Sequence, residues 1–402
     1  MIKFIDAEAV SGHMFSVYYS LKIYMKEYMV SEAIIAVDIG TTNIEAMLCG
    51  TDYSIIDHKS ERNEQRRFGS DVAARICAAV SGHAEEMRVC VLSQICGLIT
   101  GLITAHPSEN VTQAAIAGNT TMLHILMGYD CEGLGLYPFK TVSLSEIHTT
   151  THKLISDYLT DADPAFPDIP LTILPGISAY IGADIYAGAV ACGFAVTDEV
   201  NMLIDLGTNA EIMLGNKDRI VTASAAAGPA FESGRIFKGT EGIEMLHRLL
   251  TLGVIDPTGL MKDEYFEQPA QKNIRKLQLA KAAIRAAVDI LMSKFESSKS
   301  FQPTASVPQE VTDDGDRSFC EISNVYISGN FGNNIDENAC IAVGMLPERF
   351  RGKCRPFGNT VLSGSIRYAL DPASRIPPEN IEEIVLANEP EFNEILMSSI
   401  NL

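Results

Sequence analysis

The chain has 402 residues, 47% of them hydrophobic and 20% charged, which suits a globular protein large enough for two domains with full cores. Its formal net charge of −20 argues against nucleic acid or an anionic membrane surface as a partner, because both are negatively charged themselves. None of the nine cysteines forms a C-x-x-C pair, so the sequence predicts free thiols in a reducing cytoplasm and no iron–sulfur cluster.

The first 31 residues carry no motif, and no signal peptide is visible. Two later apolar runs, 89–105 and 178–196, approach the length of a membrane span. The first contains Ser93 and Gln94 and the second contains Asp184, so we expect core helices and no membrane-spanning segment.

The first chemically informative stretch is Ile34 to Ala46, which predicts a strand, a tight turn and a second strand. Asp38 ends the apolar strand, where a carboxylate is costly to bury unless a cation such as phosphate-bound Mg²⁺ meets it. In the turn that follows, glycine lets the backbone approach a phosphate, and backbone N–H groups and hydroxyls supply donors. The turn consists of Gly40, Thr41, Thr42 and Asn43. An ordinary hairpin with turn-forming residues is the alternative.

Two helix starts follow in the same half of the chain. Ser70 or Asp71 is expected to cap a helix. Residues 111–117 predict a strand, after which Gly118-Asn119-Thr120 opens a helix whose free N–H groups would attract an anion. A cap without any ligand is the alternative at this second helix.

The stretch 148–193 contains a false metal signal and a small-residue helix. His148 and His152 are four residues apart, but the run between them is threonine, a poor helix former, so no metal site is predicted. Alanines and glycines between Ala179 and Gly193 predict a helix that packs closely between two halves of the protein. Asp184 within it either faces a cleft and holds a magnesium-bound water or caps a neighbour.

Asn201 to Leu214 repeats the plan of the first hairpin, with Asp205 at the strand end and Gly207, Thr208 and Asn209 in the turn. Two copies far apart indicate two similar domains that face one phosphate-containing ligand. A glycine- and alanine-rich turn that includes Gly228 follows the next strand.

The last third of the chain predicts a long amphipathic helix at Ile274 to Phe295 and a surface loop at 297–319. A strand at 324–328 then runs into a glycine-rich turn, Gly329-Asn330-Phe331-Gly332. The tail from 381 predicts a strand and a helix, which we expect against the first domain or a partner.

Two Asp-Gly-Thr hairpins and a late Gly-x-Phe-Gly turn resemble the superfamily of acetate kinase, sugar kinases, Hsp70 and actin. That resemblance implies an α/β fold with two ribonuclease-H-like domains around a nucleotide cleft. Three further motifs make the chain similar to the ATP-dependent reductive activators of corrinoid proteins. They are Ala117 to His124, Gly182-Ala183-Asp184 and Ala226 to Glu232.

The resemblance divides the chain into four parts. Residues 1–31 are a leader or the remnant of a linking segment, 32–198 and 199–360 are the two domains, and 361–402 packs back on the ATPase core. Family members carry a [2Fe–2S] domain ahead of the ATPase, which is not expected here. The segment near 235–256 is shorter than in the family, which puts affinity or hydrolysis in doubt.

The resemblance also assigns residues to a magnesium-ATP site. Asp38 and Asp205 would be catalytic and would hold Mg²⁺ through water, and the late turn would line adenosine. The residues expected to contact the nucleotide are Gly40, Thr41, Thr42, Asn43, Gly118, Asn119, Thr120, Gly207, Thr208, Asn209, Gly228, Gly329, Asn330, Phe331 and Gly332.

The implied function is ATP-coupled reduction of a cob(II)amide protein, by a cytoplasmic homodimer that uses a separate electron donor. Two alternatives stay open. One is a small-molecule kinase of the acetate or sugar kinase type, and the other is a nucleotide-gated binding protein with little hydrolysis.

Overall fold

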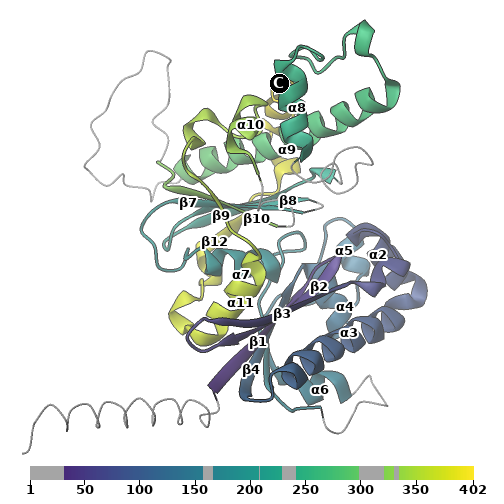
Figure 1. The fold of residues 1–402 in the computed structure, drawn as a ribbon, viewed down its shortest axis with the longest axis vertical. Coiled ribbons are helices and arrows are strands. Elements are labelled where there is room, and N and C mark those ends of the chain that lie inside the picture. The colour runs from purple at the N-terminus through teal and green to yellow at the C-terminus, as the bar shows by residue number, and fades with distance from the viewer. Residues whose placement is uncertain (1–30, 157–165, 208, 229–240, 298–320, 330–334) are drawn as a thin grey trace, which may run out of the picture.

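The computed structural model describes residues 31–156, 166–207, 209–228, 241–297, 321–329 and 335–402. Two six-stranded sheets lie one above the other, with helices between them and on their outer faces (Figure 1). Nearly all of the expected leader, 1–31, and of the expected loop, 297–319, lies outside the described residues.

Sheet one holds the first hairpin. Its strands are β1 (Ser31–Ile39), β2 (Asn43–Gly50), β3 (Ile55–Arg62), β4 (Glu109–Gly118), β5 (Ile147–Thr150) and β6 (Pro170–Ile173), in the order β3-β2-β1-β4-β6-β5. β1 is antiparallel to β2 and parallel to β4. Residues 33–37 of β1 are all buried, which explains why this strand is continuously apolar and does not alternate.

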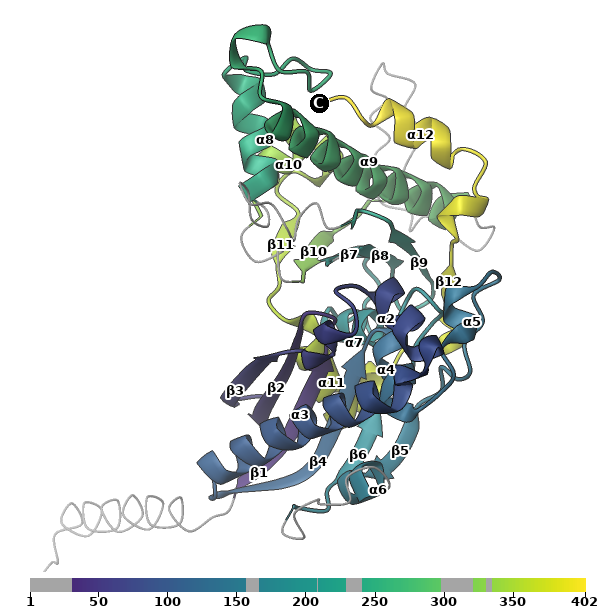
Figure 2. The ribbon, with the colours of Figure 1, turned by 90° about the vertical axis from the view of Figure 1, so that its right-hand side faces the viewer.

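Most helices of this half cover the outer face of sheet one, and the last of them lies between the two sheets. They are η1 (Glu64–Arg67), α2 (Val72–Ala78), η2 (Ala79–His83), α3 (Ala84–Ala105), α4 (Thr120–Met127), α5 (Glu132–Gly135), α6 (Thr151–Ser156) and α7 (Ala183–Ala191). The run Val72–Ala105 is long and apolar enough to cross a membrane by length and composition alone. Its α3 part contacts β2, β3 and α4 and buries Leu92, Leu98 and Leu102, so the structure places it in the core (Figure 2).

Sheet two repeats the arrangement around the second hairpin. Its strands are β7 (Asn201–Leu206), β8 (Ala210–Gly215), β9 (Ile220–Ala225), β10 (Asn324–Ser328), β11 (Cys354–Pro356) and β12 (Ile381–Glu383), in the order β11-β10-β7-β8-β9-β12. Here β7 is antiparallel to β8 and parallel to β10, as β1 is to β2 and β4. Two sheets with this shared core order confirm the predicted pair of ribonuclease-H-like domains.

Most elements of this half cover sheet two, whereas the helix at 360–370 packs on sheet one. They are α8 (Glu241–Thr251), η4 (Asp263–Tyr265), α9 (Gln268–Ser297), α10 (Glu337–Ala342), η6 (Glu348–Phe350), α11 (Thr360–Leu370), η7 (Pro372–Ser374), η8 (Pro378–Asn380), η9 (Leu386–Asn388) and α12 (Phe392–Ser398). The predicted amphipathic helix is confirmed as α9, which lies across β8 and β9 and buries Ile284, Val288 and Leu291 (Figure 2).

The helices α7 and α11 cross between the two sheets, as the small-residue pattern of α7 predicts (Figure 1). A Cβ atom on Gly364 of α11 would lie 1.8 Å from the carbonyl oxygen of Ala187 in α7, so the two backbones touch directly. Leu362 and Ile366 of α11 pack on Ile34 and Ala36 of sheet one. The crossing therefore joins the two halves of the protein.

The tail does not pack where the sequence indicated. β12 pairs with β9 of sheet two, and α12 packs against α9, so this segment packs mainly on the second domain and not on the first, while contact with a partner stays a prediction. Lys281 of α9 donates a hydrogen bond to the carbonyl oxygen of Ser399 at 2.6 Å. The segment after 360 thus divides, with α11 on sheet one and β12 and α12 on sheet two. The boundaries assigned from the sequence stay predictions.

Candidate functional site

A cavity of about 340 Å³ lies between the two sheets and is lined by both hairpins and by the N-termini of α4 and α11. The structure brings eleven of the residues assigned from the sequence to this cavity. They are Asp38, Gly40, Thr41, Thr42, Asn43, Asn119, Thr120, Asp205, Gly207, Asn209 and Gly329. Both strand–turn–strand copies therefore face one space, as their repetition predicts.

The other assigned residues divide into two groups. Gly118 lies behind the first hairpin, where a Cβ atom would be 2.8 Å from the carbonyl oxygen of Ile39, and Gly228 is also absent from the cavity lining. Thr208, Asn330, Phe331 and Gly332 lie outside the described residues.

The turn of the first hairpin is held from behind by side chains of the following segment. Asn63 donates from Nδ2 to the carbonyl oxygen of Gly40 at 2.9 Å. The guanidinium group of Arg75 donates to the carbonyl oxygens of Thr41 and Gly69. Arg75 is buried, and burial lowers its pKa to about 10. Because these donors occupy the carbonyl groups, the turn is fixed with its other side toward the cavity.

The start of α4 continues the lining. Asn119 caps the helix, accepting from the backbone N–H of Met122 at 3.0 Å, and donates to the Thr41 hydroxyl at 3.0 Å. Asp71 similarly caps α2 through the backbone N–H of Ala74 at 2.8 Å. Both predicted caps are confirmed, and whether the N–H groups of α4 also bind an anion stays a prediction.

Gly329 closes the other side of the cavity at the end of β10. Its φ of +85° is a conformation that favours glycine, and a Cβ atom here would lie 2.4 Å from the carbonyl oxygen of Leu206. The preceding Ser328 donates from Oγ to Asp205 Oδ2 at 2.6 Å. The turn can therefore approach the second hairpin only because residue 329 has no side chain.

Five carboxylates line the cavity, and among its described residues none is lysine or arginine. Four of them form two cross-strand pairs, Asp38 with Glu45 and Asp205 with Glu211, and Asp184 is the fifth. Burial raises the pKa of Asp38, Asp205 and Glu211, and for Asp38 and Glu211 neighbouring carboxylates add to the shift. Burial raises the pKa of Asp184 to about 7.

This donor set fits a hard cation held through water. No group of three or more Asp, Glu, His or Cys side chains within the described ranges forms a direct metal cage. Mg²⁺ usually keeps several of its waters and takes only one or two carboxylates directly. The cavity offers carboxylates with no lysine or arginine among its described lining, next to turns that can bind phosphate. These features suit a Mg²⁺ ion bound through its waters.

The sequence interpretation missed three residues of the site. Glu45 and Glu211 were visible as one charged side chain in each apolar second strand of the repeated hairpin, but they received no role. Asn359 carried a subtler signal, because Gly358-Asn359-Thr360 repeats the Gly118-Asn119-Thr120 motif at a second helix start. In the structure Asn359 caps α11 and lines the cavity.

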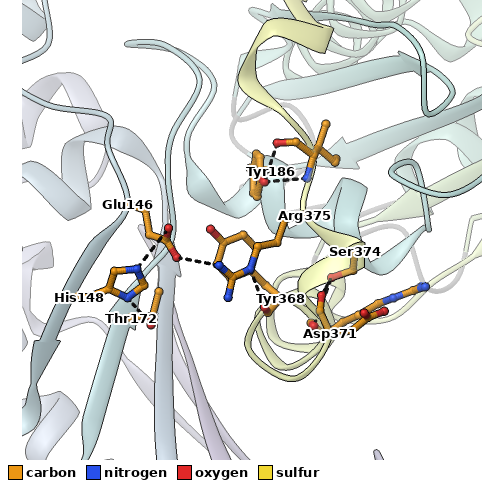
Figure 3. A network of polar contacts seen from close by, with 10 residues as sticks. Glu146, His148, Thr172, Tyr186, Tyr368, Asp371, Ser374 and Arg375 are labelled. Atoms are coloured by element: carbon orange, nitrogen blue, oxygen red, sulfur yellow. Dashed lines mark hydrogen bonds and ion pairs between the residues drawn. The ribbon is translucent and has the colours of Figure 1, made fainter.

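A polar network fixes the connector between α11 and β12 to sheet one (Figure 3). Glu146 lies between His148 of β5, at 3.4 Å, and Arg375 of the connector, at 3.7 Å. The Tyr186 hydroxyl of α7 accepts from the backbone N–H of Ile376 and donates to its carbonyl oxygen, each at 2.9 Å. Nearby, Ser178 donates to Glu383 of β12 at 2.6 Å. These contacts fasten the connector to sheet one and α7, and they link β12 of sheet two to the first half of the chain.

Two family models match this chain. Residues 34–197 match the RACo middle region, and residues 199–245 and 307–402 match the C-terminal domain of RACo, the ASKHA domain. The chain belongs to this family of reductive activators.

Two relatives are similar to this chain in sequence, one over most of its length and one over a short part. It is 25% identical to the corrinoid activation enzyme RamQ of Eubacterium limosum over 443 residues, which covers 90% of this chain and 69% of that protein. A [Co(II) methylated amine-specific corrinoid protein] reductase of Methanosarcina barkeri is 45% identical over 69 residues, covering 17% of this chain and 13% of that protein.

A solved structure of a reductive activator for a corrinoid, iron–sulfur protein superposes with a TM-score of 0.73 at 25% identity. The superposition covers 92% of this chain and 66% of that structure. The chain thus spans about two thirds of the length of RamQ and of this solved structure.

Proposed function

We propose that this family member binds magnesium-ATP in the cavity and couples ATP hydrolysis to reductive activation of a corrinoid protein. One observation carries the proposal, namely two glycine-turn hairpins that present paired acids to a single cavity between two ribonuclease-H-like sheets. The similarity to corrinoid activators supports the choice of client.

Each part of the cavity has a role in this proposal. Asp38 and Asp205 would hold Mg²⁺ through water, and the bound ion would offset the charge of the phosphates. The turns at 40–43 and 207–209 would donate to the β- and γ-phosphates, and the turn that begins at Gly329 would line adenosine. Water attacks the γ-phosphorus, the bond to the β-phosphate oxygen breaks, and catalysis consists mostly of positioning and charge neutralisation.

The mechanical output would be movement of the two sheets about the α7–α11 crossing. Domain closure on ATP and opening after hydrolysis are common in enzymes built this way. The electron that converts cob(II)amide to cob(I)amide would come from a separate donor. We further propose that the protein acts in the cytoplasm as a homodimer.

The test is phosphate release from magnesium-ATP, measured with and without a cob(II)amide corrinoid protein and a low-potential reductant. Release that rises with the corrinoid protein, together with the appearance of cob(I)amide absorbance, supports the proposal. The Asp205→Ala variant should lose both signals, whereas Asp198→Ala, on an exposed side chain that pairs with Lys217, should keep them.

Two outcomes would contradict this function. Phosphate transfer to a small-molecule acceptor, without release to water, would indicate a kinase. Tight ATP binding without release in any condition would indicate a nucleotide-gated binding protein.

A further inference from the structure

We propose that Asn359 is a positioning residue of the phosphate end of the cavity, where its side-chain amide holds the carboxylates of Asp38 and Glu45. The inference rests on the proposed function and deepens it, because it names the group that keeps the first acid pair in place before the ligand arrives.

The contacts of Asn359 are specific to this pair. Its Nδ2 atom lies 3.1 Å from Asp38 Oδ2 and 3.1 Å from Glu45 Oε2. An amide NH₂ group has two hydrogens to donate, so one side chain satisfies both carboxylates at once. Asn359 is uncharged, so it can hold two acids together without removing the negative charge that a cation needs.

The orientation of this amide is determined by the helix that it caps. Asn359 Oδ1 accepts from the backbone N–H of Leu362 at 3.0 Å, which is the usual cap geometry at the start of α11. Turning the amide over would place an NH₂ group against this N–H and an oxygen against two carboxylates. The NH₂ end must therefore face Asp38 and Glu45.

Asn359 also lies where the chain passes from one sheet to the other. The backbone N–H of Phe357 still donates to Ile327 of sheet two, at 2.9 Å. Two residues later the Asn359 side chain contacts the acids of sheet one, and the helix that it starts packs on that sheet. The amide is therefore carried by a helix that packs on the same sheet as Asp38, immediately after the chain leaves sheet two.

Within the part of the chain that the structure describes, the second acid pair has no equivalent amide among its contacts. Asp205 accepts from the Ser328 hydroxyl at 2.6 Å, and Glu211 accepts from the Ser224 hydroxyl at 3.4 Å. In the first pair Glu45 accepts from Asn359 and also lies 3.0 Å from Nε2 of His58. Among the described residues, only the first pair is thus bridged by a side-chain amide.

Two variants separate positioning from capping. Asn359→Ser keeps an oxygen for the helix cap but loses the bridge between the acids. Asn359→Asp keeps the size and the cap and adds a third carboxylate at the same place. Asn380→Ser is the matched control, because this asparagine donates its amide to the Lys217 carbonyl oxygen at 2.9 Å on the surface.

The experiment is calorimetric titration of the full chain with magnesium-ATP, and separately with Mn²⁺ in the absence of nucleotide. Losing hydrogen bonds to charged groups predicts a fall in magnesium-ATP affinity of roughly ten- to hundredfold for Asn359→Ser, and no change for Asn380→Ser. Asn359→Asp should also bind magnesium-ATP more weakly, but it should bind free Mn²⁺ at least several-fold more tightly than the original chain.

The outcomes distinguish this inference from the proposed function. If the original chain binds magnesium-ATP and Asn359→Ser binds it equally well, Asn359 is only a helix cap and the inference is overturned. If the original chain binds no ATP, the proposed function fails, and the Mn²⁺ titration then decides about Asn359. In that case unchanged Mn²⁺ affinity in Asn359→Asp overturns the inference and tighter binding supports it.

Discussion

Asp205 in β7 lies directly opposite Glu211 in β8, next to the turn of the second hairpin. Two like charges opposite each other in a sheet destabilise the pairing. Among the described residues, neither forms an ion pair with a cationic side chain, and both line the cavity. Without a ligand, the paired acids lower the stability of the folded protein, and a bound cation would compensate for their charge. Removing one acid should therefore stabilise the protein and weaken ligand binding.

Replacing Asp205 by asparagine tests that opposition. Asp205→Asn removes one charge of the pair but keeps an oxygen for the Ser328 hydroxyl. We expect the free energy of unfolding without ligand to rise by roughly 1 kcal/mol, while the increase in melting temperature caused by magnesium-ATP disappears. Thermal unfolding with and without magnesium-ATP measures both effects.

The control for this prediction is Asp198→Asn, whose side chain is 82% exposed and pairs with Lys217. An exposed pair contributes about 0–1 kcal/mol, so this variant should keep both its stability and its response to the ligand. A lower stability of Asp205→Asn without ligand would show that the Asp205 charge has a compensating partner.

Asp184 predicts a pH dependence of stability. The pKa of its carboxyl group is about 7 in the folded protein, against an ordinary value of 3.8, because burial disfavours the charge. Between these values the folded protein binds more protons than the unfolded protein, so the free energy of unfolding falls as the pH rises from about 4 to 7. Above about pH 7 the stability that the protonated Asp184 contributes is lost.

Asp184→Asn isolates this contribution, because asparagine does not titrate. The free energy of unfolding of the original chain minus that of the variant should fall by at most a few kcal/mol between about pH 4 and pH 7. Urea denaturation of both proteins across this range measures the difference. A difference that stays constant with pH would mean that Asp184 is ionised in the folded protein throughout.

The two hairpins could be predicted because each is local. A carboxylate, one apolar residue, Gly-Thr and a second apolar strand lie within about a dozen residues, and the turn geometry depends on those residues alone. Their repetition then indicated two domains and one ligand. The helix caps at Asp71 and Asn119 were equally predictable, since a cap is a contact between neighbours in sequence.

Other parts of the site depend on contacts over long separations in the chain. Asn359 reaches Asp38 across 321 positions, and Ser178 reaches Glu383 across 205. No period or spacing encodes such a pair. The position of the tail on sheet two could not be predicted for the same reason. β12 is a three-residue strand whose place is determined by its partner β9.

Arg75 should maintain the shape of the first hairpin. Its guanidinium donates to the carbonyl oxygens of Thr41 and Gly69, and Arg75→Met would leave these partly buried acceptors without these donors. We expect the free energy of unfolding to fall by roughly 2 kcal/mol and magnesium-ATP to bind more weakly. Urea denaturation and hydrogen exchange of the amides at 40–43 measure the two effects.

The exposed Arg66 provides the control, and Arg66→Met should change neither measurement. Arg75→Met with unchanged amide exchange at 40–43 would show that the hairpin keeps its shape without the guanidinium.

The α7–α11 crossing should not tolerate a single added methyl group. In Gly364→Ala the new Cβ atom would lie 1.8 Å from the carbonyl oxygen of Ala187, which is backbone and cannot move without shifting α7. We expect a loss of about 1–3 kcal/mol in the free energy of unfolding, measured by thermal or urea unfolding. Gly97→Ala is the matched control, because Gly97 also lies inside a helix, α3, but has nothing within 4 Å of its Cβ position. That variant should gain roughly 0.5–1 kcal/mol from the better helix propensity of alanine. Equal stabilities of the two variants would mean that the two helices can separate at this point, and the crossing would then not be the rigid contact between the halves.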